Sequence, residues 1–287
     1  MFIFNNYIKR IFILIIISLI IFFTLNLKKS EARRSNDIFS HHKTYIEAHR
    51  GVNREFFENT MEAFKKAIEY QLDSIETDVW LTKDNVLVLL HGNSREGSLF
   101  KYYDHPGNVI YLTWAELSTY KTIKDNLTMP RLSDLMEISK NKIFINLEIK
   151  DKRIDLVFPH LMKLIQKYNF FNQILLSSPF YEYYNKIQEF NKKHHKKIMF
   201  GFVYDMNSMN LFDYSKKGNT LNIYWKDATK EVCDKAHKNR MAIIAWIDIF
   251  EEDNNDMYKK LVENGVDVIC CNNPKLLKSY LEKYYQK

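Results

Sequence analysis

The chain has 287 residues, of which 46% are hydrophobic, and its formal net charge is +7. This length is enough for one large domain or two small ones, and the apolar content excludes a mainly disordered chain. Residues 1–34 carry +5 of the charge and residues 35–287 carry +2, so the basic balance does not indicate a nucleic-acid-binding surface. The three cysteines, Cys233, Cys270 and Cys271, have neither the spacing of a disulfide framework nor that of a zinc site.

An uncharged apolar run, residues 11–27, follows Lys9 and Arg10. Its 17 residues exceed a signal-peptide core of about 7–15 residues and reach the lower limit of a spanning helix of about 17–25, so both interpretations are open. Ser30 and Ala32 suit a cleavage site, but basic residues directly after the run favour an uncleaved anchor. We therefore expect residues 1–34 to be a single-pass membrane anchor, or alternatively a signal segment that is cleaved to give a secreted protein. We expect residues 35–43 to be a polar linker.

The rest of the chain, residues 44–287, alternates short strand-like runs with amphipathic helical segments. Eight runs have strand character: 45–48, 74–81, 142–149, 173–177, 197–204, 220–225, 241–247 and 266–271. Between them, "TMEAFKKAIEY" and "RLSDLMEISK" have apolar residues at helical spacing, and "DMYKKLVENG" ends on the helix-stopping Gly265. Repeated alternation of this kind predicts an α/β fold, a closed (β/α)8 barrel with its helices outside.

The run at residues 85–91 is also strand-like, but only three residues, Thr82, Lys83 and Asp84, separate it from the strand before it. Parallel neighbours need a crossover of about a dozen residues, so we expect this run to be the return arm of a hairpin. Residues 92–128 then form a long aromatic section without helical or strand periodicity. Such loops in compact domains are usually functional, and we expect this one to be a small insertion after the second strand.

Ionisable residues stand at the ends of the first predicted strands, where a (β/α)8 barrel builds its active site. They are His49, Arg50, Glu76, Asp78, His91, Glu148 and Lys150. Residues two apart on a strand share a face, so Glu76 and Asp78 point the same way. Taken singly, these residues also suit salt bridges or structural hydrogen bonds. Together, at corresponding strand ends, they predict one shared site.

Three carboxylates facing one cavity repel each other unless a cation lies among them. Glu76, Asp78 and Glu148 therefore predict a hard divalent ion with oxygen ligands, such as Mg²⁺, Ca²⁺ or Mn²⁺. No cysteine lies beside these residues in the sequence to suggest zinc. Arg50 and Lys150 add the positive charge of a phosphate site.

Two histidines complete this set. His49 and His91 can serve as proton donor and acceptor near neutral pH. A metal ion, two cationic side chains and two imidazoles together indicate cleavage of a phosphodiester.

Several stretches resemble the glycerophosphodiester phosphodiesterase family. They are "AHRG" (48–51), "ENTMEAFKKAIEYQLDSIETDVWLTKDNVLVLLH" (58–91), "LEIK" (147–150), "AHKNRMAIIAWI" (236–247) and "NGVDVICCNNP" (264–274). The resemblance implies a TIM barrel that hydrolyses glycerophosphodiesters to glycerol 3-phosphate and an alcohol. It also implies that His49 and His91 are the general acid/base pair and that Glu76, Asp78 and Glu148 hold the metal. By the same resemblance Arg50, Lys150 and Trp246 contact the phosphate or substrate, and residues 92–128 cap the site.

The chain departs from the family pattern at two places. Gly92 follows His91 where the family usually has an Asp that can hold the imidazole. Ile247, Asp248 and Ile249 stand where the family often has Thr-Val-Asn.

Three functions remain open at this point. The first is a membrane-tethered glycerophosphodiesterase, with residues 11–27 in the membrane and a small-molecule or lysolipid phosphodiester as substrate. The second is a lysophospholipase D that releases head groups. The third is a barrel that binds phosphodiesters without cleaving them.

Overall fold

The computed structural model describes residues 43–92, 96–204, 213 and 218–286. The chain divides into two units, residues 1–40 and 41–287, and the second contains everything described below. The predicted anchor or signal segment, and the predicted linker apart from Lys43, lie outside the described residues. None of the helices in the described part of the chain has both the length and the apolar character needed to span a membrane.

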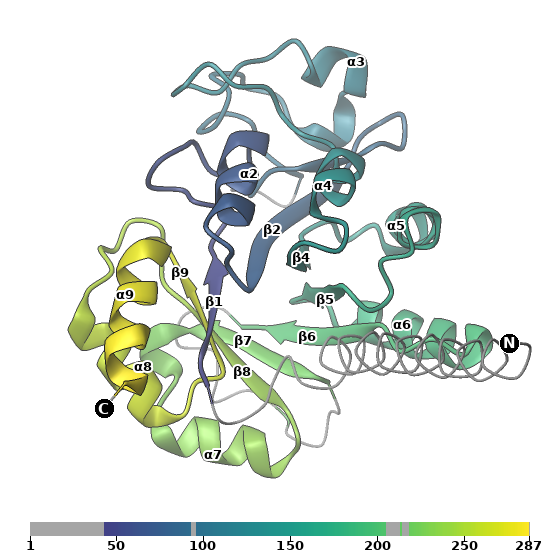
Figure 1. Cartoon of the computed structure of the whole chain (residues 1–287). Coiled ribbons are helices and arrows are strands. Elements are labelled where there is room, and N and C mark those ends of the chain that lie inside the picture. The colour runs from purple at the N-terminus through teal and green to yellow at the C-terminus, as the bar shows by residue number, and fades with distance from the viewer. Residues whose placement is uncertain (1–42, 93–95, 205–212, 214–217, 287) are drawn as a thin grey trace, which may run out of the picture. The chain divides into compact units, whose positions relative to one another are not determined.

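Eight parallel strands form a closed barrel (Figure 1). They are β1 (Tyr45–Ala48), β2 (Ser74–Leu81), β4 (Phe144–Ile149), β5 (Ile174–Ser178), β6 (Met199–Val203), β7 (Thr220–Tyr224), β8 (Ala242–Trp246) and β9 (Val268–Cys271). Each strand pairs with the next barrel strand in the chain, and β9 pairs with β1 to close the ring. The predicted (β/α)8 barrel and its eight strands are therefore confirmed.

The ninth strand, β3 (Leu87–Leu89), pairs antiparallel with β2 and is not one of the eight strands of the closed ring. Asn85 adopts a left-handed φ of 65° in the turn that joins them. The backbone N–H of Leu90 then donates to the Asp78 carbonyl at 3.0 Å, which carries the pairing up to His91. The predicted hairpin is confirmed, and it delivers a histidine to the carboxyl end of β2.

Helices cover the barrel from outside. They are α2 (Met61–Glu69), α4 (Leu132–Ser139), α5 (Ile154–Tyr168), α6 (Tyr181–His194), α7 (Lys230–Lys238), α8 (Asn255–Asn264) and α9 (Pro274–Tyr285), with a short 3-10 turn, η3 (Trp225–Asp227), before α7. Local sequence fixes several ends: the Thr60 side chain caps α2, and Gly265 ends α8 with a φ of 85°. Buried apolar residues of the strands and of the inner helix faces form one continuous core.

The insertion has a small core of its own, beside β2 and β3. It contains η1 (Val109–Tyr111) and α3 (Trp114–Leu117), and the described part of its core includes Trp80, Val88, Leu90, Leu99, Tyr102, Tyr103, Val109, Leu117 and Met129. Thr113 and Glu116 form a reciprocal capping box at the start of α3. Tyr102 and Tyr103 are therefore packed inside a folded unit, whereas Phe100 and Tyr111 of the same section are exposed.

Candidate active site

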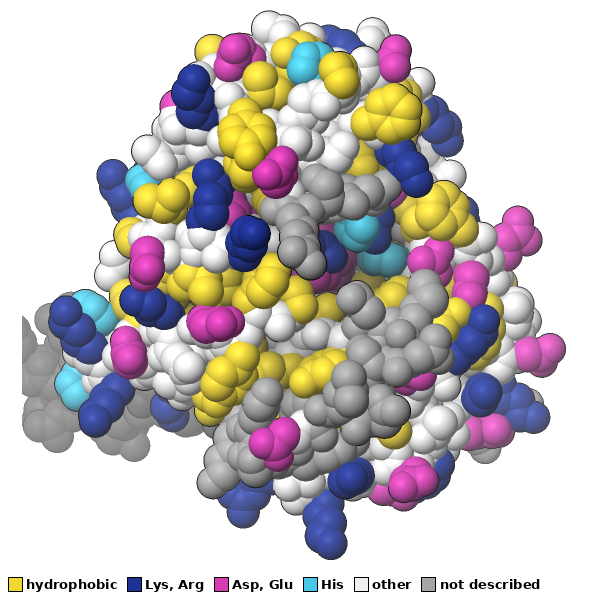
Figure 2. All heavy atoms as spheres, turned by 180° about the vertical axis from the view of Figure 1, so that it is seen from behind, with side chains coloured by type: hydrophobic (Ala, Val, Ile, Leu, Met, Phe, Trp, Pro, Cys, Tyr) yellow, Lys and Arg dark blue, Asp and Glu magenta, His cyan; other side chains and the backbone are white. Residues whose placement is uncertain are grey.

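The carboxyl ends of the barrel strands surround a cavity of about 1310 Å³. All eight residues predicted for the site line it: His49, Arg50, Glu76, Asp78, His91, Glu148, Lys150 and Trp246. In the space-filling view the hollow exposes histidine side chains between apolar and charged groups (Figure 2). The structure thus brings the sequence-predicted residues to one place, while their roles remain predictions.

The turn after β1 directs His49 and Arg50 into this cavity. Arg50 has a φ of 57° and Gly51 a φ of 80°, both in the left-handed region. A Cβ on Gly51 would lie 2.8 Å from the Cβ of Ala63 in α2, so only glycine fits this turn. The turned backbone N–H of Arg50 donates to Glu76 Oε2 at 3.0 Å, which links the end of β1 to the carboxylates of β2.

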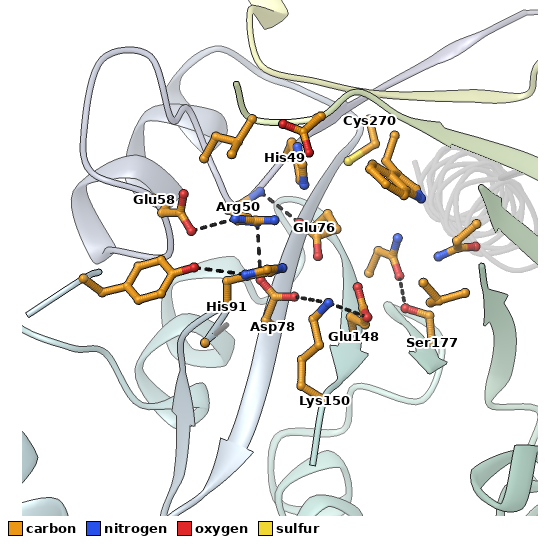
Figure 3. A pocket seen from close by; sticks show the side chains of 18 of the residues that line it. His49, Arg50, Glu58, Glu76, Asp78, His91, Glu148, Lys150, Ser177 and Cys270 are labelled. Carbon is orange, nitrogen blue, oxygen red and sulfur yellow. Dashed lines mark hydrogen bonds and ion pairs between the residues drawn. The ribbon is translucent and has the colours of Figure 1, made fainter. Parts of the chain in front are cut away.

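Three carboxylates converge on the side of β2 and β4 (Figure 3). Glu76 and Asp78 lie on one face of β2, and Asp78 is in register with Glu148 on β4. One oxygen from each of the three lies within 4.8 Å of the other two. The predicted convergence of these acids is therefore present in the structure.

Two cations are interleaved with these acids (Figure 3). Lys150 Nζ is 2.7 Å from Glu148 Oε1 and 3.4 Å from Asp78 Oδ1. Arg50 Nη1 is 2.8 Å from Glu58 Oε1, and Arg50 Nε is 3.6 Å from Asp78 Oδ2. Asp78 thus lies between both cations, and it is almost fully buried.

The charges in this cluster do not balance. When all are ionised, four of the carboxylates that line the cavity, those of Glu58, Glu76, Asp78 and Glu148, face two cations, Arg50 and Lys150, while Glu47 accepts from Ser74 and Asn146 instead. Burial, and then the neighbouring Asp78 charge, raises the pKa of Glu76 well above its usual range. Burial also raises the pKa of Glu148, although Lys150 acts in the opposite direction. The cluster is two positive charges short.

These residues fit a divalent cation. An ion with two positive charges would balance the cluster, and hard oxygen ligands suit Mg²⁺, Ca²⁺ or Mn²⁺. Asp78 Oδ1 is buried and, apart from its 3.4 Å ion pair with Lys150, makes no hydrogen bond to any described side chain or backbone group, so it is available as a ligand. Its carboxyl also stays ionised: burial opposes ionisation, but Lys150, His91 and Arg50 hold its pKa below the usual range.

The two imidazoles have different partners. His49 Nδ1 lies 3.2 Å from Asn272 Oδ1, and His91 Nδ1 lies 3.0 Å from the Tyr102 hydroxyl of the insertion. Burial, followed by the Arg50 charge, lowers the pKa of His49 to about 3 and that of His91 to about 2. Both shifts favour the neutral ring, which can accept a proton at its bare nitrogen, and the imidazolium that forms can donate a proton in turn.

The departure at Gly92 has a structural reason. Gly92 has a left-handed φ of 65°, and a Cβ there would lie 2.8 Å from the Gly97 Cα. A side chain at this position would therefore clash with the insertion backbone. Tyr102, rather than an Asp after the histidine, contacts the His91 ring in this chain.

One expectation about the surroundings was wrong. The sequence places no cysteine beside the acids, but Cys270 lines the cavity, and its sulfur lies within 4.8 Å of ligand atoms of His49 and Glu76. The reason is barrel closure, which pairs β9 with β1 and sets Cys270 opposite Glu47. Burial raises the pKa of the Cys270 thiol well above its usual range, so it remains protonated.

Sequence reasoning also missed Glu58, Asn59, Tyr102 and Asn272 as site residues. Asn59 donates to Asp78 Oδ2 at 3.0 Å and accepts from the Thr77 hydroxyl at 2.6 Å. Glu58 and Asn59 directly precede the Thr60 cap, so their positions in the sequence indicate the start of a helix and not a site. Trp246, which was predicted, is half-buried at the end of β8, 5.1 Å from the Tyr224 ring centroid.

Comparisons with known proteins agree with this geometry. Residues 49–276 match the model of the "Glycerophosphoryl diester phosphodiesterase family". A glycerophosphodiester phosphodiesterase from Caldanaerobacter subterraneus subsp. tengcongensis is 28% identical over 84% of this chain and 99% of that protein.

Solved structures share the fold. A phosphodiesterase from Oleispira antarctica, in complex with the product sn-glycerol-3-phosphate, superimposes with a TM-score of 0.70 at 17% identity, over 84% of this chain and 97% of that one. A glycerophosphodiester phosphodiesterase from Thermotoga maritima does so with a TM-score of 0.64 at 21% identity, over 84% and 99%. The family model covers most of the barrel, so the chain belongs to the glycerophosphoryl diester phosphodiesterase family, and the predicted family and enzyme class are confirmed.

Proposed function

We propose that this protein hydrolyses glycerophosphodiesters to glycerol 3-phosphate and an alcohol. The observation that carries the proposal is the single cavity in which three carboxylates, two cations and two imidazoles meet. The Oleispira antarctica phosphodiesterase was solved with the same product, and the Caldanaerobacter relative carries the same activity in its name.

The residues of the cavity have different roles in the reaction. Arg50 and Lys150 are placed to bind the phosphate oxygens, Arg50 by its planar guanidinium and Lys150 as a point charge. One imidazole accepts the proton of the attacking oxygen, and the other, in its imidazolium form, donates a proton to the departing alcohol oxygen as the P–O bond breaks. Glu76, Asp78 and Glu148 would hold the divalent ion, which offsets negative charge in the transition state.

Apolar groups near the reacting residues support a second candidate, lysophospholipase D activity. The cavity lining includes Phe57, Phe100, Ile123, Phe180 and Phe250. Phe100 is 65% exposed and Phe250 is 88% exposed, which is unusual for large apolar side chains. Such a lining can hold an acyl chain while the phosphate lies among the charged residues.

We also propose that residues 11–27 tether the enzyme to a membrane. The uncharged run with basic residues at both ends supports this location, and signal cleavage with secretion is the alternative. A membrane location would bring the enzyme to lipid substrates. Membrane fractionation of the expressed full chain, with mass spectrometry of its N-terminus, distinguishes the two.

A substrate panel tests the activity. We expect the purified full chain to release glycerol 3-phosphate from glycerophosphocholine with Mg²⁺ or Ca²⁺, and to lose this activity in chelator. Release of choline from lysophosphatidylcholine at a higher kcat/KM than from glycerophosphocholine would favour lysophospholipase D. Binding of these compounds without hydrolysis under any divalent ion would indicate the third function, a non-catalytic barrel.

Two variants test the histidine roles. His49→Ala and His91→Ala should each lower kcat by at least about 100-fold while the melting temperature of the fold is kept. Near-wild-type rates in both would overturn the assignment.

A further inference from the structure

The amide of Asn272 has a fixed orientation at the closing seam of the barrel. Its Nδ2 donates to the carbonyl of Asp248 at 2.9 Å and lies 3.3 Å from that of Glu251. Carbonyl oxygens only accept, so the NH₂ group must face them. The other end of the amide, Oδ1, is therefore turned toward His49 and accepts from Asn53 Nδ2 at 2.8 Å.

This orientation determines where the proton of His49 sits. An amide oxygen cannot donate, so a hydrogen bond across the 3.2 Å between Asn272 Oδ1 and His49 Nδ1 requires a proton on Nδ1. A neutral imidazole carries one ring proton, which leaves a lone pair on Nε2. His49 lines the cavity, and its ring points toward Arg50 and Glu76 (Figure 3).

The surroundings hold both partners firmly. The backbone N–H of His49 donates to the Cys271 carbonyl at 3.1 Å, and its carbonyl accepts from Asn53 at 2.7 Å. The backbone N–H of Asn272 donates to Asp253 Oδ2 at 2.9 Å. Asn272 is fully buried, so water does not compete for its amide.

We infer that Asn272 is a positioning residue for the reaction: it fixes His49 in the tautomer whose bare Nε2 accepts a proton in the cavity. The inference rests on the proposed function and deepens it. His49 then acts as the proton acceptor, and the ring reaches the substrate in one orientation and one protonation state. Asn272 acts through His49 and does not itself contact the reacting atoms.

The first test reads the tautomer directly, without any turnover. Long-range ¹H–¹⁵N correlation spectra of the ¹⁵N-histidine-labelled full chain at pH 7 should assign a protonated Nδ1 and a bare Nε2 to His49. His49→Gln identifies the signal. A protonated Nε2 in the wild-type protein would overturn the inference. If the substrate panel shows no hydrolysis, the proposed function fails, but this measurement still decides the tautomer.

The second test measures the effect of Asn272 on kcat and KM. Asn272→Leu, which has a similar volume but no acceptor, should lower kcat by about 10- to 100-fold with KM within about threefold. Asn272→Asp keeps an acceptor for Nδ1–H and should keep kcat at least about tenfold above that of Asn272→Leu.

Asn53→Ala is the matched control, because it removes two hydrogen bonds from the same turn but leaves the His49–Asn272 contact. Its kcat should stay within about threefold of wild type. An equal loss in Asn53→Ala and Asn272→Leu would show that loop rigidity, not the tautomer, matters. If Asn272→Leu does not fold, the wild-type spectrum and the Asn272→Asp rate still decide.

Discussion

Replacing Glu148 by Gln tests whether the three carboxylates hold a divalent ion. Glu148 Oε1 accepts from Lys150 Nζ at 2.7 Å, and the carbonyl oxygen of Gln can keep this contact. The substitution removes one buried negative charge whose pKa is already raised by burial. We therefore expect the ion-free stability of Glu148→Gln to lie within about 1 kcal/mol of wild type.

The effect on ion binding should be much larger. Loss of groups that only support metal ligands typically weakens affinity about 10- to 100-fold, so loss of a direct ligand should cost at least about 100-fold. At an ion concentration of about 100 times Kd, binding stabilises the wild-type fold by about 2.7 kcal/mol. For a domain of this size, that raises the melting temperature by about 5–11 °C. At the same concentration the variant gains only about 0.4 kcal/mol, or about 1 °C.

Differential scanning fluorimetry with and without Mg²⁺ or Ca²⁺ measures these shifts, alongside kcat with glycerophosphocholine. Glu58→Gln is the matched control: Glu58 lines the same cavity and pairs with Arg50, but it lies outside the group of three acids. We expect it to keep most of the ion-dependent shift. If Glu148→Gln keeps the full shift, or if Glu58→Gln loses as much, then Glu76, Asp78 and Glu148 do not hold the ion.

Three further outcomes follow from the contacts in the cavity. Tyr102→Phe removes the hydroxyl 3.0 Å from His91 Nδ1 and should lower kcat about 3- to 30-fold. Tyr103→Phe, at the neighbouring buried position, should leave kcat unchanged. Equal kcat values in the two variants would refute the role of the Tyr102 hydroxyl. Asp78→Ala removes the partner that Arg50 and Lys150 share but leaves their contacts with Glu58 and Glu148, so urea unfolding should show a loss of about 1–3 kcal/mol, and an unchanged unfolding free energy would contradict this. Because the folded-state pKa of His91 is lowered to about 2, its contribution to stability is present above the unfolded-state pKa of about 6.5 and is lost as pH falls below it. In that window His91→Gln should reduce the slope of unfolding free energy against pH by up to about 1.4 kcal/mol per pH unit, and an unchanged slope would refute the shift.

Local patterns were sufficient to predict most of the fold. Strand runs such as residues 74–81 and helical spacing such as that of residues 61–69 match β2 and α2, because burial on the barrel imposes these periodicities. The hairpin could also be predicted, since three residues cannot form a parallel crossover. The insertion was harder: its capping box at Thr113 and Glu116 is local, but its core depends on Trp80 and Val88 from the hairpin.

The sequence was sufficient to predict the site residues that lie at the end of a strand. Glu76, Asp78 and Glu148 could be grouped because parallel strands place their carboxyl ends at one edge of the barrel. Tyr102 and Asn272 could not be assigned to the site from the sequence, because their contacts depend on how distant segments of the chain come together. The contact from Asn272 to His49 spans 223 residues of sequence, and only closure of the ring makes it.

Closure also explains why two adjacent residues, His49 and Arg50, belong to different networks. The backbone turns left-handed at Arg50, so its N–H meets Glu76 on β2 and its guanidinium reaches Glu58 and Asp78. His49, one residue earlier, is still hydrogen-bonded to the end of β9 through Cys271 and is held there by Asn272. His49 is therefore fixed by the last strand and Arg50 by the second. This separation requires the turn at Gly51, because a side chain there would collide with α2.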